Sequence, residues 1–235
     1  FNVATALSRM EVPTGFVCPL SNDVHGQRLG AHLQQHGIQQ CIADTVDAPT
    51  AIAEVFTDKN GHPRYQFHRE QTADRALSER PPNRSIPKHL DALHFGSLVL
   101  AQATDWPAWK DAIQKARQSG AFIAFDPNLR IDLIDNLSTY RNRLEEAVEL
   151  CHLLKASDED LSLLEPNQDP TSTIQRWCTS TRMVVLTEGK KGAQAWMSPG
   201  DHGDHVTCEA SGGRASGSRC GEDGKRMGPP MLRLG

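Results

Sequence analysis

Three side chains able to bind a polar substrate follow one apolar segment of the chain. After residues 121–124 the sequence reads Phe125-Asp126-Pro127-Asn128-Leu129-Arg130, which brings a carboxylate, an amide and a guanidinium close together. Proline ends a strand because it lacks a backbone donor, and ligands of open α/β sheets collect beyond the carboxyl ends of the strands. We therefore expect this segment to face a substrate. The alternative is a turn with solvated polar side chains.

Other apolar segments of the chain also end in polar residues. Strands are predicted at residues 93–95, 122–125, 153–155 and 183–186, with helical patterns between them at 106–118 and 140–151. A period of about 30 residues is typical of βαβ units, whose right-handed crossovers make the strands parallel. We expect the strand ends to share one rim: Gly96-Ser97, Asp126-Pro127-Asn128, Ala156-Ser157-Asp158 and Thr187-Glu188-Gly189.

The front of the chain follows a different order. A helix is predicted over residues 1–10, with Val3, Ala6, Leu7 and Met10 on one face. A strand at 16–20, a second helix at 25–36 that ends at Gly37, and a strand at 38–43 follow. Residues 51–57 and 64–69 are predicted to pair as a hairpin, because Asn60-Gly61 lies between two β-favouring runs. This hairpin interrupts the alternation, so we interpret it as a lid or a small second sheet.

Composition and motifs exclude several classes of function. The 235 residues carry a net charge of −4, 38% of them are hydrophobic, and no apolar run could span a bilayer, so neither a membrane nor nucleic acid is expected as a partner. The six cysteines form no CxxC pair, which predicts reduced thiols and a cytoplasmic protein. The ten histidines lack a metal-ligand spacing such as HExxH. Without a Walker-type loop or a G-x-G-x-x-G motif after a strand, P-loop and Rossmann functions lose support.

The last 25 residues, from Ser211, differ from the rest of the chain. They hold seven of the 18 glycines and carry a charge of +3, from five Lys or Arg and two acids, which leaves −7 for the preceding residues. A segment rich in Gly, Arg and Ser cannot bury enough apolar area to offset its ordering entropy. We expect one domain over 1–206 and a disordered tail over 207–235. A nucleic-acid-binding tail is the alternative, but no aromatic residues lie among its charges.

The order of several motifs resembles the PfkB (ribokinase-like) carbohydrate kinases, especially the fructokinase-like and 2-keto-3-deoxygluconate-kinase-like members. The resemblance covers residues 1–197 and implies a ribokinase-like α/β fold, with a mostly parallel central sheet flanked by helices and a small β lid at about 51–69. Near the start, Asn2-Val3-Ala4 is similar to the helix after the family's Gly-Gly sugar-binding turn, and Ser21 to Gly26 is similar to its G-x-D-x-x-G segment. The segments that resemble the lid strands are Pro49-Thr50-Ala51, Phe67-His68-Arg69 and Ala73-Asp74. Three later segments match family patterns: Phe125 to Arg130 matches D-x-N-x-R, 155–161 matches K-x-S-D-E-E-L, and 185–192 matches V-x-T-x-G-x-x-G-A.

This resemblance implies an ATP-dependent kinase that phosphorylates a sugar or sugar-acid hydroxyl, with fructose or 2-keto-3-deoxygluconate as model substrates and ATP and Mg²⁺ as cofactors. By analogy Asn2 would bind sugar hydroxyls, and Phe67 and Arg69 would close over the sugar. Asn128 and Arg130 would lie at the substrate, where a guanidinium can donate two parallel hydrogen bonds to one polar edge. The alternatives are a helix cap for Asn2 and a solvated strand arginine for Arg69.

The resemblance also implies a nucleotide site at Ser157, Thr187, Gly189 and Gly192. Ser157 with Asp160 fits a capping box, which needs no ligand. In the family this segment contacts phosphates or magnesium-bound water, so Asp160 is an indirect metal candidate. The two glycines would let the backbone approach a nucleotide, although a hairpin turn before residues 193–196 would use the same glycines.

The sequence departs from the family pattern in ways that affect function. Glu11 and Ser21 stand where the family usually has glycine. The first strand and the Gly-Gly turn are absent, and no D-T-x-G-A-G-D motif, which supplies the anion hole and the base, follows Val206. We therefore assign no catalytic base and expect a fragment with impaired phosphoryl transfer. A slip of the reading frame near residues 207–213 would explain the tail, and translation of the other two frames tests it.

Two other functions stay open at this point. A catalytically inactive sugar- or nucleotide-binding module would be stabilised by ligand without turnover. A nucleoside (adenosine-like) kinase is also possible on the same scaffold, because a fold does not fix the substrate. The resemblance further implies that two copies pair through the lid.

Overall fold

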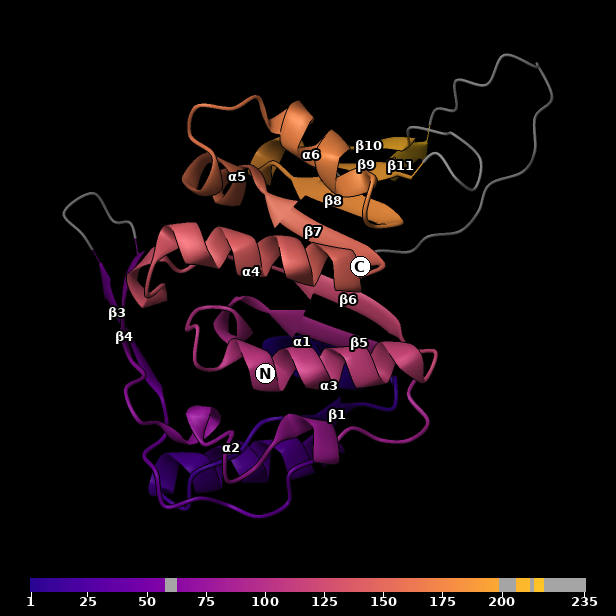
Figure 1. The fold of residues 1–235 in the computed structure, drawn as a ribbon. Helices are drawn as coiled ribbons and strands as arrows, with labels where there is room; N and C mark the ends of the chain where they lie inside the picture. Colours follow the sequence, from indigo (N-terminus) through magenta and orange to yellow (C-terminus); the bar gives the residue numbers. More distant parts are fainter. Residues whose placement is uncertain (58–62, 199–205, 212–213, 218–235) are drawn as a thin grey trace. The chain divides into compact units, whose positions relative to one another are not determined.

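The computed structural model divides the chain into two compact units, Phe1–Leu154 and Lys155–Gly235, which we call unit 1 and unit 2. It describes residues 1–57, 63–198, 206–211 and 214–217 (Figure 1). The sequence predicts a single domain over 1–206, and no linker composition marks the boundary at Leu154.

Unit 1 contains a short parallel sheet, its covering helices and a separate hairpin. Strand β5 runs parallel to β6, with Phe95 beside Phe125, and Phe125 lies beside Leu154 of β7. The elements of unit 1 are α1 (Asn2–Arg9), β1 (Gly15–Phe16), α2 (Val24–Gln35), β2 (Gln39–Gln40), β3 (Ile52–Thr57), β4 (Pro63–His68), β5 (Ala92–Gly96), α3 (Trp106–Gln118), β6 (Phe122–Asp126), α4 (Leu137–Leu150) and the start of β7 (Leu153–Ser157).

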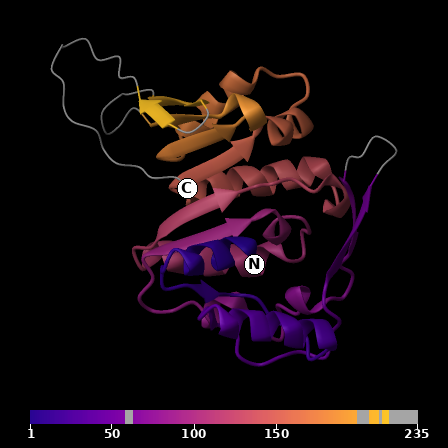
Figure 2. The same cartoon turned by 180° about the vertical axis from the view of Figure 1, so that it is seen from behind.

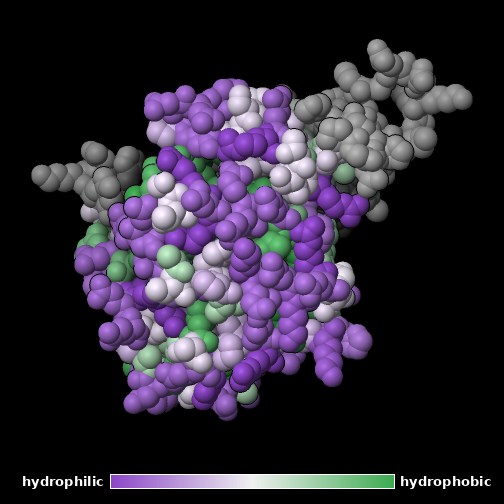
Figure 3. Space-filling view, viewed as in Figure 1, coloured by the Kyte–Doolittle hydropathy of each residue, from purple (hydrophilic) through white to green (hydrophobic). Residues whose placement is uncertain are grey.

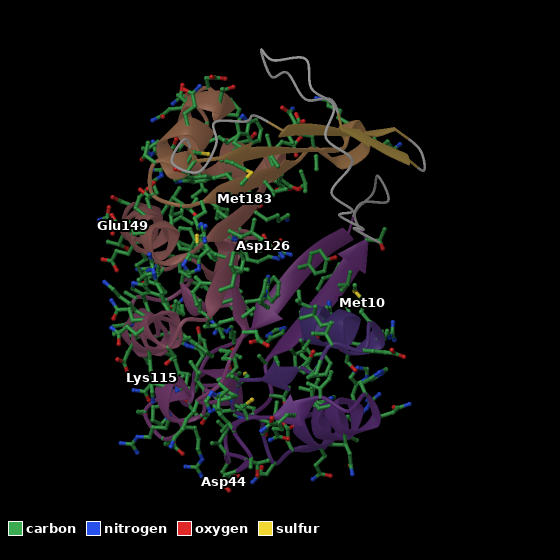
Figure 4. The ribbon with its side chains drawn as sticks, turned by 90° about the vertical axis from the view of Figure 1, so that its right-hand side faces the viewer. Met10, Asp44, Lys115, Asp126, Glu149 and Met183 are labelled. Atoms are coloured by element: carbon green, nitrogen blue, oxygen red, sulfur yellow. The ribbon has the colours of Figure 1, made fainter. Side chains whose placement is uncertain are left out.

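The two faces of the β5–β6 pair are covered by different helices. Helices α3 and α4 lie on one face and α1 lies on the other (Figures 1 and 2). The buried residues of α3 include Ala112, Ile113 and Ala116, whose spacing of three and four turns one stripe of the helix to the sheet. Lys115 of α3 and Glu149 of α4 point outward (Figure 4), and the surface over these helices is mainly hydrophilic (Figure 3). The helices predicted at 106–118 and 140–151 are thus confirmed.

The predicted strands at 16–20 and 38–43 are shorter in the structure. Strands β1 and β2 pair in parallel over two residues each, and Ser21 forms an isolated parallel bridge with Val46. Pro19 has no backbone N–H to donate, which accounts for the gap between the paired strand and the bridge. Beside these strands, a small core gathers Ala4 of α1, Leu20, Leu33 of α2 and Ile38.

The predicted hairpin is confirmed. Strands β3 and β4 are antiparallel, with Val55 opposite Tyr65 and Ala53 opposite Phe67, and they form a two-stranded sheet of their own. The hairpin stands apart from β5 and β6 as an arm (Figure 1). The Asn60-Gly61 turn itself lies outside the described residues.

Three helices of unit 1 end in the same motif. At the end of α2 the N–H of Ile38 donates to the carbonyl of Leu33, and Gly37 between them has φ 62°. Gly120 ends α3 in the same way, with φ 91°. Helix α1 also uses this Schellman geometry, but its left-handed position is Glu11, with φ 62°. Of these three left-handed positions, the family pattern predicts a glycine at position 11, and this chain has Glu11 there.

Replacing Glu11 with glycine is therefore expected to stabilise unit 1. A left-handed backbone costs a non-glycine residue about 1–2 kcal/mol, and the higher unfolded-state entropy of glycine reduces the net gain to roughly 0.5–1 kcal/mol. Urea denaturation followed by circular dichroism measures the difference. Gly37→Ala is the matched control: a Cβ there would meet no atom within 4 Å, so only the backbone penalty acts, and stability should fall. A lower denaturation midpoint for Glu11→Gly would contradict the assignment.

Unit 2 is built on antiparallel strands. Strand β8 pairs with β9, β9 with β10 and β10 with β11, all antiparallel. Its buried residues include Ile174 and Trp177 of α6 and Val184 and Leu186 of β8. Its elements are the end of β7, α5 (Asp158–Leu164), α6 (Pro170–Cys178), β8 (Met183–Thr187), β9 (Ala193–Met197), β10 (Val206–Ser211) and β11 (Arg214–Gly217).

Strands β10 and β11 fall within the tail that the sequence predicts to be disordered. Thr207 and Cys208 of β10 pair with β9, and residues 208–211 pair with 214–217 of β11; such backbone pairing needs no apolar side chains. The rest of the 207–235 tail lies outside the described residues. Among the helices of the described ranges, none combines the length and the apolar character needed to cross a membrane.

Candidate functional site

The structure separates the predicted site residues into two groups. Those predicted to bind the sugar all belong to unit 1: Asn2, Phe67, Arg69, Asn128 and Arg130. Those predicted to bind the nucleotide, with the indirect metal candidate, all belong to unit 2: Ser157, Asp160, Thr187, Gly189 and Gly192. Within unit 1 a hydrogen bond joins Asn128 and Arg130, whereas Asn2, Phe67 and Arg69 each have separate surroundings.

The segment after β6 presents a guanidinium with unused donors. Gly96 of β5 pairs beside Asp126, so both strands end at the same edge, and Figure 4 shows Asp126 on this sheet. Arg130 Nη1 donates to the side-chain oxygen of Asn128 at 2.8 Å and to the carbonyl of Leu129 at 2.7 Å. Within the described ranges, Arg130 Nε and Nη2 have no hydrogen-bond partner. Asn128 is exposed and adopts φ 35°, a left-handed backbone that asparagine tolerates better than most residues.

Arg69 lies in a buried ion network after the hairpin. Only 8% of the residue is exposed, so it is not the solvated strand arginine considered above. Its Nε donates to Asp74 at 2.6 Å, and its Nη2 lies 3.8 Å from Asp105. Asp105 also accepts two hydrogen bonds from Arg75, at 2.8 and 3.1 Å, and these raise the pKa of the Arg75 guanidinium. This network anchors the end of β4 to the start of α3.

Asp23 anchors the other end of the hairpin. It caps α2 by accepting from the Gly26 N–H at 2.7 Å, and it accepts from the N–H and the hydroxyl of Thr50 at 2.8 and 2.7 Å. The amide of Gly26 and then the donors of Thr50 hold the pKa of Asp23 far below its usual range. The N–H of Ala73 donates to the carbonyl of Pro49, so the two ends of the hairpin are also joined directly.

Asn2 lines a cavity of about 330 Å³ rather than capping a helix. Phe1 occupies the N-cap position of α1, and no side chain caps the helix. The other lining residues are Phe1, Thr5, Ala6, Arg9 and His32. A second cavity, of about 410 Å³, shares Phe1 and His32 with the first and extends along α2 to residues 50–53 at the start of the hairpin. Neither cavity is lined by Phe67, Arg69, Asn128 or Arg130.

Phe67 lies on the hairpin itself. It is half-buried, and its ring is nearly parallel to that of Tyr65, with centroids 6.2 Å apart. Phe67 therefore lies beside an aromatic ring, whereas Arg69 lies in an ion network. Their predicted joint action over a sugar stays a prediction.

In unit 2, Ser157 and Asp160 form the predicted capping box of α5. The Ser157 hydroxyl accepts from the Asp160 N–H at 3.0 Å, and Asp160 Oδ2 accepts from the Ser157 N–H at 2.9 Å. Asp160 is buried, and this oxygen is occupied by the box. In the described ranges no group of three or more His, Cys, Asp or Glu side chains gathers in a way that could hold a metal ion.

The glycines after β8 form a hairpin turn, as in the alternative to a nucleotide-binding role given above. Gly189 and Gly192 have φ of 55° and 102°, and the N–H of Glu188 donates to the carbonyl of Gly192 at 2.8 Å. The turn carries exposed Lys190 and Lys191. The Thr187 hydroxyl lies 3.4 Å from the carbonyl of Ala156. A turn with left-handed backbone and two ammonium groups is compatible with a phosphate-bearing ligand, because such turns expose amide donors.

Several residues of these networks were not assigned by sequence reasoning. Asp23 has a detectable signal, because it directly precedes a helical pattern and Asp is a preferred N-cap. Asp105 also precedes a helix, but its side chain makes no cap hydrogen bond and binds Arg75 instead. That pairing has no local signal.

Comparison with known proteins gives a consistent result. A family model described as pfkB family carbohydrate kinase matches residues 1–209. The chain is 28% identical over 196 residues to the probable fructokinase-4 of Arabidopsis thaliana, which covers 82% of this chain and 60% of the relative. It is 29% identical over 194 residues to the probable fructokinase-3 of the same plant, covering 81% and 56%. The chain thus spans at most about 60% of the length of these curated relatives.

Solved structures confirm the expected ribokinase-like α/β fold. A fructokinase from Vibrio cholerae in apo form superimposes with a TM-score of 0.73 at 26% identity, covering 84% of this chain and 68% of that one. A double-mutant form of it, with fructose, ADP and potassium ion bound, gives 0.73 at 25% identity, covering 84% and 64%. The aminoimidazole riboside kinase from Salmonella enterica, at 19% identity, 0.71 and coverage of 84% and 64%, is alike in fold alone.

Proposed function

The chain belongs to the pfkB family of carbohydrate kinases, and from this premise we propose that it binds a sugar through unit 1 and ATP through unit 2. The proposed reaction of the family scaffold is transfer of the γ-phosphoryl group to a hydroxyl of a hexose or sugar acid, with fructose as the first candidate. The observation that carries the proposal is the half-buried Arg130 after β6, whose Nη1 donates to the Asn128 side chain and whose Nε and Nη2 have no hydrogen-bond partner in the described ranges.

The chemistry of the sugar side follows from these donors. A sugar hydroxyl both donates and accepts hydrogen bonds, so an amide beside a guanidinium can bind two neighbouring oxygens of a polyol. Arg130 Nη1 is held by Asn128 and Leu129, which leaves Nη2 and Nε as the donors proposed to bind the sugar. Asn2 and Phe67 are proposed to supply further contacts to the sugar.

The nucleotide side is proposed to lie at Ser157, Thr187, Gly189 and Gly192. The left-handed turn at Gly189 and Gly192 and the ammonium groups of Lys190 and Lys191 fit a phosphate-bearing ligand. ATP would supply the transferred phosphoryl group, and Mg²⁺ would be held mainly by its phosphates, since magnesium sites of this kind use few protein carboxylates. Asp160 would act on it only indirectly, because its Oδ2 is occupied by the capping box.

Phosphoryl transfer by this chain is proposed to be impaired. The reaction depends on positioning, on charge stabilisation and on removal of the hydroxyl proton. The family's D-T-x-G-A-G-D motif supplies the charge stabilisation and the base, and the sequence has no match to it. A ligand-binding chain with weak turnover is therefore the second candidate function, favoured by this one feature of the sequence.

A melting experiment tests the proposal. At a concentration near one hundred times its Kd, fructose should stabilise the protein by about 2.7 kcal/mol, a rise of roughly 5–10 °C. Arg130→Met should lose most of this rise because it removes the free donors. Arg84→Met, which removes an exposed arginine outside the proposed site, should retain it.

Three results would count against the proposal in different ways. No shift with fructose, 2-keto-3-deoxygluconate or ribose would contradict sugar binding, and a shift with adenosine alone would favour a nucleoside substrate. Sugar-dependent ADP production at about 1–100 per second, the ordinary range for kinases, would contradict only the impairment.

We also propose that two copies associate through the hairpin. Ala53, Val55, Tyr65 and Phe67 alternate along paired strands and so share one face, and Val55 and Tyr65 are exposed. A two-stranded sheet is marginal in water unless this face is covered. Sedimentation velocity should show a dimer that Val55→Lys converts to a monomer, and a monomeric parent protein would contradict the proposal.

A further inference from the structure

Two loops of unit 1 are joined beyond the ends of β5 and β6. One follows β5 and includes residues 100–103, and the other follows β6 and includes the Asn128 to Arg130 segment and residues 131–136. The Gln102 side chain donates to the carbonyl of Leu133 at 2.7 Å, and the N–H of Asp135 donates to the carbonyl of Ala101 at 3.3 Å. These contacts hold the second loop against the first.

Arg143 of α4 lies beneath this junction and binds both loops. The residue is 6% exposed. Its Nε donates to the carbonyl of Leu100 at 2.8 Å, and its Nη2 donates to the carbonyl of Ala101 at 3.3 Å and to Asp135 Oδ1 at 2.6 Å. One buried guanidinium therefore satisfies carbonyls of the first loop and the carboxylate of the second.

Asp135 extends the connection. Its Oδ2 accepts from the N–H of Ala103 at 2.8 Å, so the carboxylate links Arg143 to the first loop through a second path. Burial raises the pKa of Asp135, but the hydrogen bond from Arg143, with those from the Ala103 and Asn136 amides, outweighs it and leaves the pKa lowered. The carboxylate is thus held in its charged form at neutral pH.

The part of the loop that is held against the first loop directly follows Asn128 and Arg130, the proposed sugar-binding residues. Residues 131–133 form a single turn of 3₁₀ helix, in which the N–H of Leu133 donates to the carbonyl of Arg130 at 2.9 Å. Because the Gln102 side chain binds the carbonyl of Leu133, the first loop is tied to the turn in which the carbonyl of Arg130 is hydrogen-bonded. On the other side of Arg130, Leu129 is buried. The backbone of Arg130 is bounded by a buried side chain and by a turn tied to the first loop.

We propose that Arg143 is a positioning residue, which holds the loop after β6 against the loop after β5 and thereby sets the direction of the Asn128 and Arg130 side chains. In the described part of the chain Arg143 makes no hydrogen bond or ion pair with either side chain. The inference rests on the proposed function for its consequence in sugar binding, whereas the loop junction is a property of the fold. Lysine cannot replace this arginine, because one ammonium group cannot reach two carbonyls and a carboxylate in the directions of a planar guanidinium.

Amide hydrogen exchange of Arg143→Lys tests the junction without any ligand. The amides of Ala103 and Asp135 donate across the junction, and that of Leu133 donates within the turn that the junction holds; the exchange of all three should become at least tenfold faster. The amide of Phe125 in the neighbouring strand should change far less. Unchanged exchange at the three junction amides would overturn the proposal.

Val148→Ala is the control for a loss of stability alone. Val148 is buried on the same helix, and its aliphatic side chain cannot form a hydrogen bond with either loop. It should weaken α4 without a selective effect on the junction amides. A selective effect of equal size in this variant would show that any destabilisation of α4 loosens the loops, which would also overturn the role of Arg143.

Fructose affinity separates this inference from the proposed function. Isothermal titration well below the melting temperature should give a Kd at least tenfold higher in Arg143→Lys than in the parent protein, and a nearly unchanged Kd in Val148→Ala. A parent protein that binds no sugar contradicts the proposed function, and hydrogen exchange then decides the inference alone. Sugar binding that is unchanged in Arg143→Lys contradicts the positioning role.

Discussion

Replacement of Gly26 with alanine is expected to lower the free energy of unfolding by about 3 kcal/mol or more. A Cβ at this position would overlap the carbonyl oxygen of Ser21, so the backbone has to move. Ser21 is held by its bridge to Val46, and its hydroxyl accepts from the Asp23 N–H at 3.0 Å. Movement here would disrupt the cap of α2 and the Thr50 contact with it. Thermal unfolding should shift down by roughly 6–12 °C.

Gly30→Ala is the matched control in the same helix. A Cβ there would lie 3.8 Å from the Gln40 side chain and 3.9 Å from Leu20, which is ordinary contact. In the middle of α2 this change should stabilise the helix by about 0.5–1 kcal/mol, because glycine has the larger backbone entropy to lose. Similar melting temperatures for the two variants would contradict the close approach at Gly26.

Replacement of Asp105 with alanine is expected to destabilise unit 1 by about 3 kcal/mol. Asp105 is 4% exposed and accepts two hydrogen bonds from Arg75, with Arg69 nearby. Removing one partner of a buried ion network leaves guanidinium charge without compensation, which is the costly case. Because Arg69 follows β4, the amides of the hairpin should also exchange faster with solvent.

Asp44→Ala provides the comparison at the surface. Asp44 also lies near an arginine, at 3.8 Å from Arg80, but its side chain is 80% exposed. Exposed pairs contribute about 0–1 kcal/mol, so this variant should unfold at nearly the same denaturant concentration as the parent. If Asp105→Ala proved equally mild, Arg69 would not depend on the network and could be free to contact a ligand.

Elements with a local signal could be predicted from the sequence. The apolar periodicity of residues 106–118 gave α3 with its bounds, and Gly37 marked the end of α2. Ser157 and Asp160 form the predicted capping box because both partners lie within one helical turn. Such features depend on backbone dihedral preferences and on contacts between near neighbours, which any chain of this sequence carries with it.

Elements that depend on distant partners were predicted less well. The strand expected at 16–20 shortens to β1, and the position of Arg69 is set by Asp74 and Asp105 rather than by its strand. The predicted common rim joins residues from unit 1 and unit 2 and stays a prediction. The roles of the predicted sugar-binding residues stay predictions; in the described part of the chain Arg130 Nη1 binds Asn128 and Leu129 locally, whereas Arg69 is buried in an ion network.

The order of helices and strands, the hairpin, the family resemblance and the candidate residues for a sugar and a nucleotide all follow from the sequence alone. Which of those side chains are committed to the fold becomes known only from the three-dimensional contacts. Arg75 meets Asp105 across 30 residues, and Arg143 meets Leu100 across 43. Hydrogen-bond partners so far apart are chosen by the path of the chain, because burial forces each charge to find whichever acceptor the packed elements bring within reach.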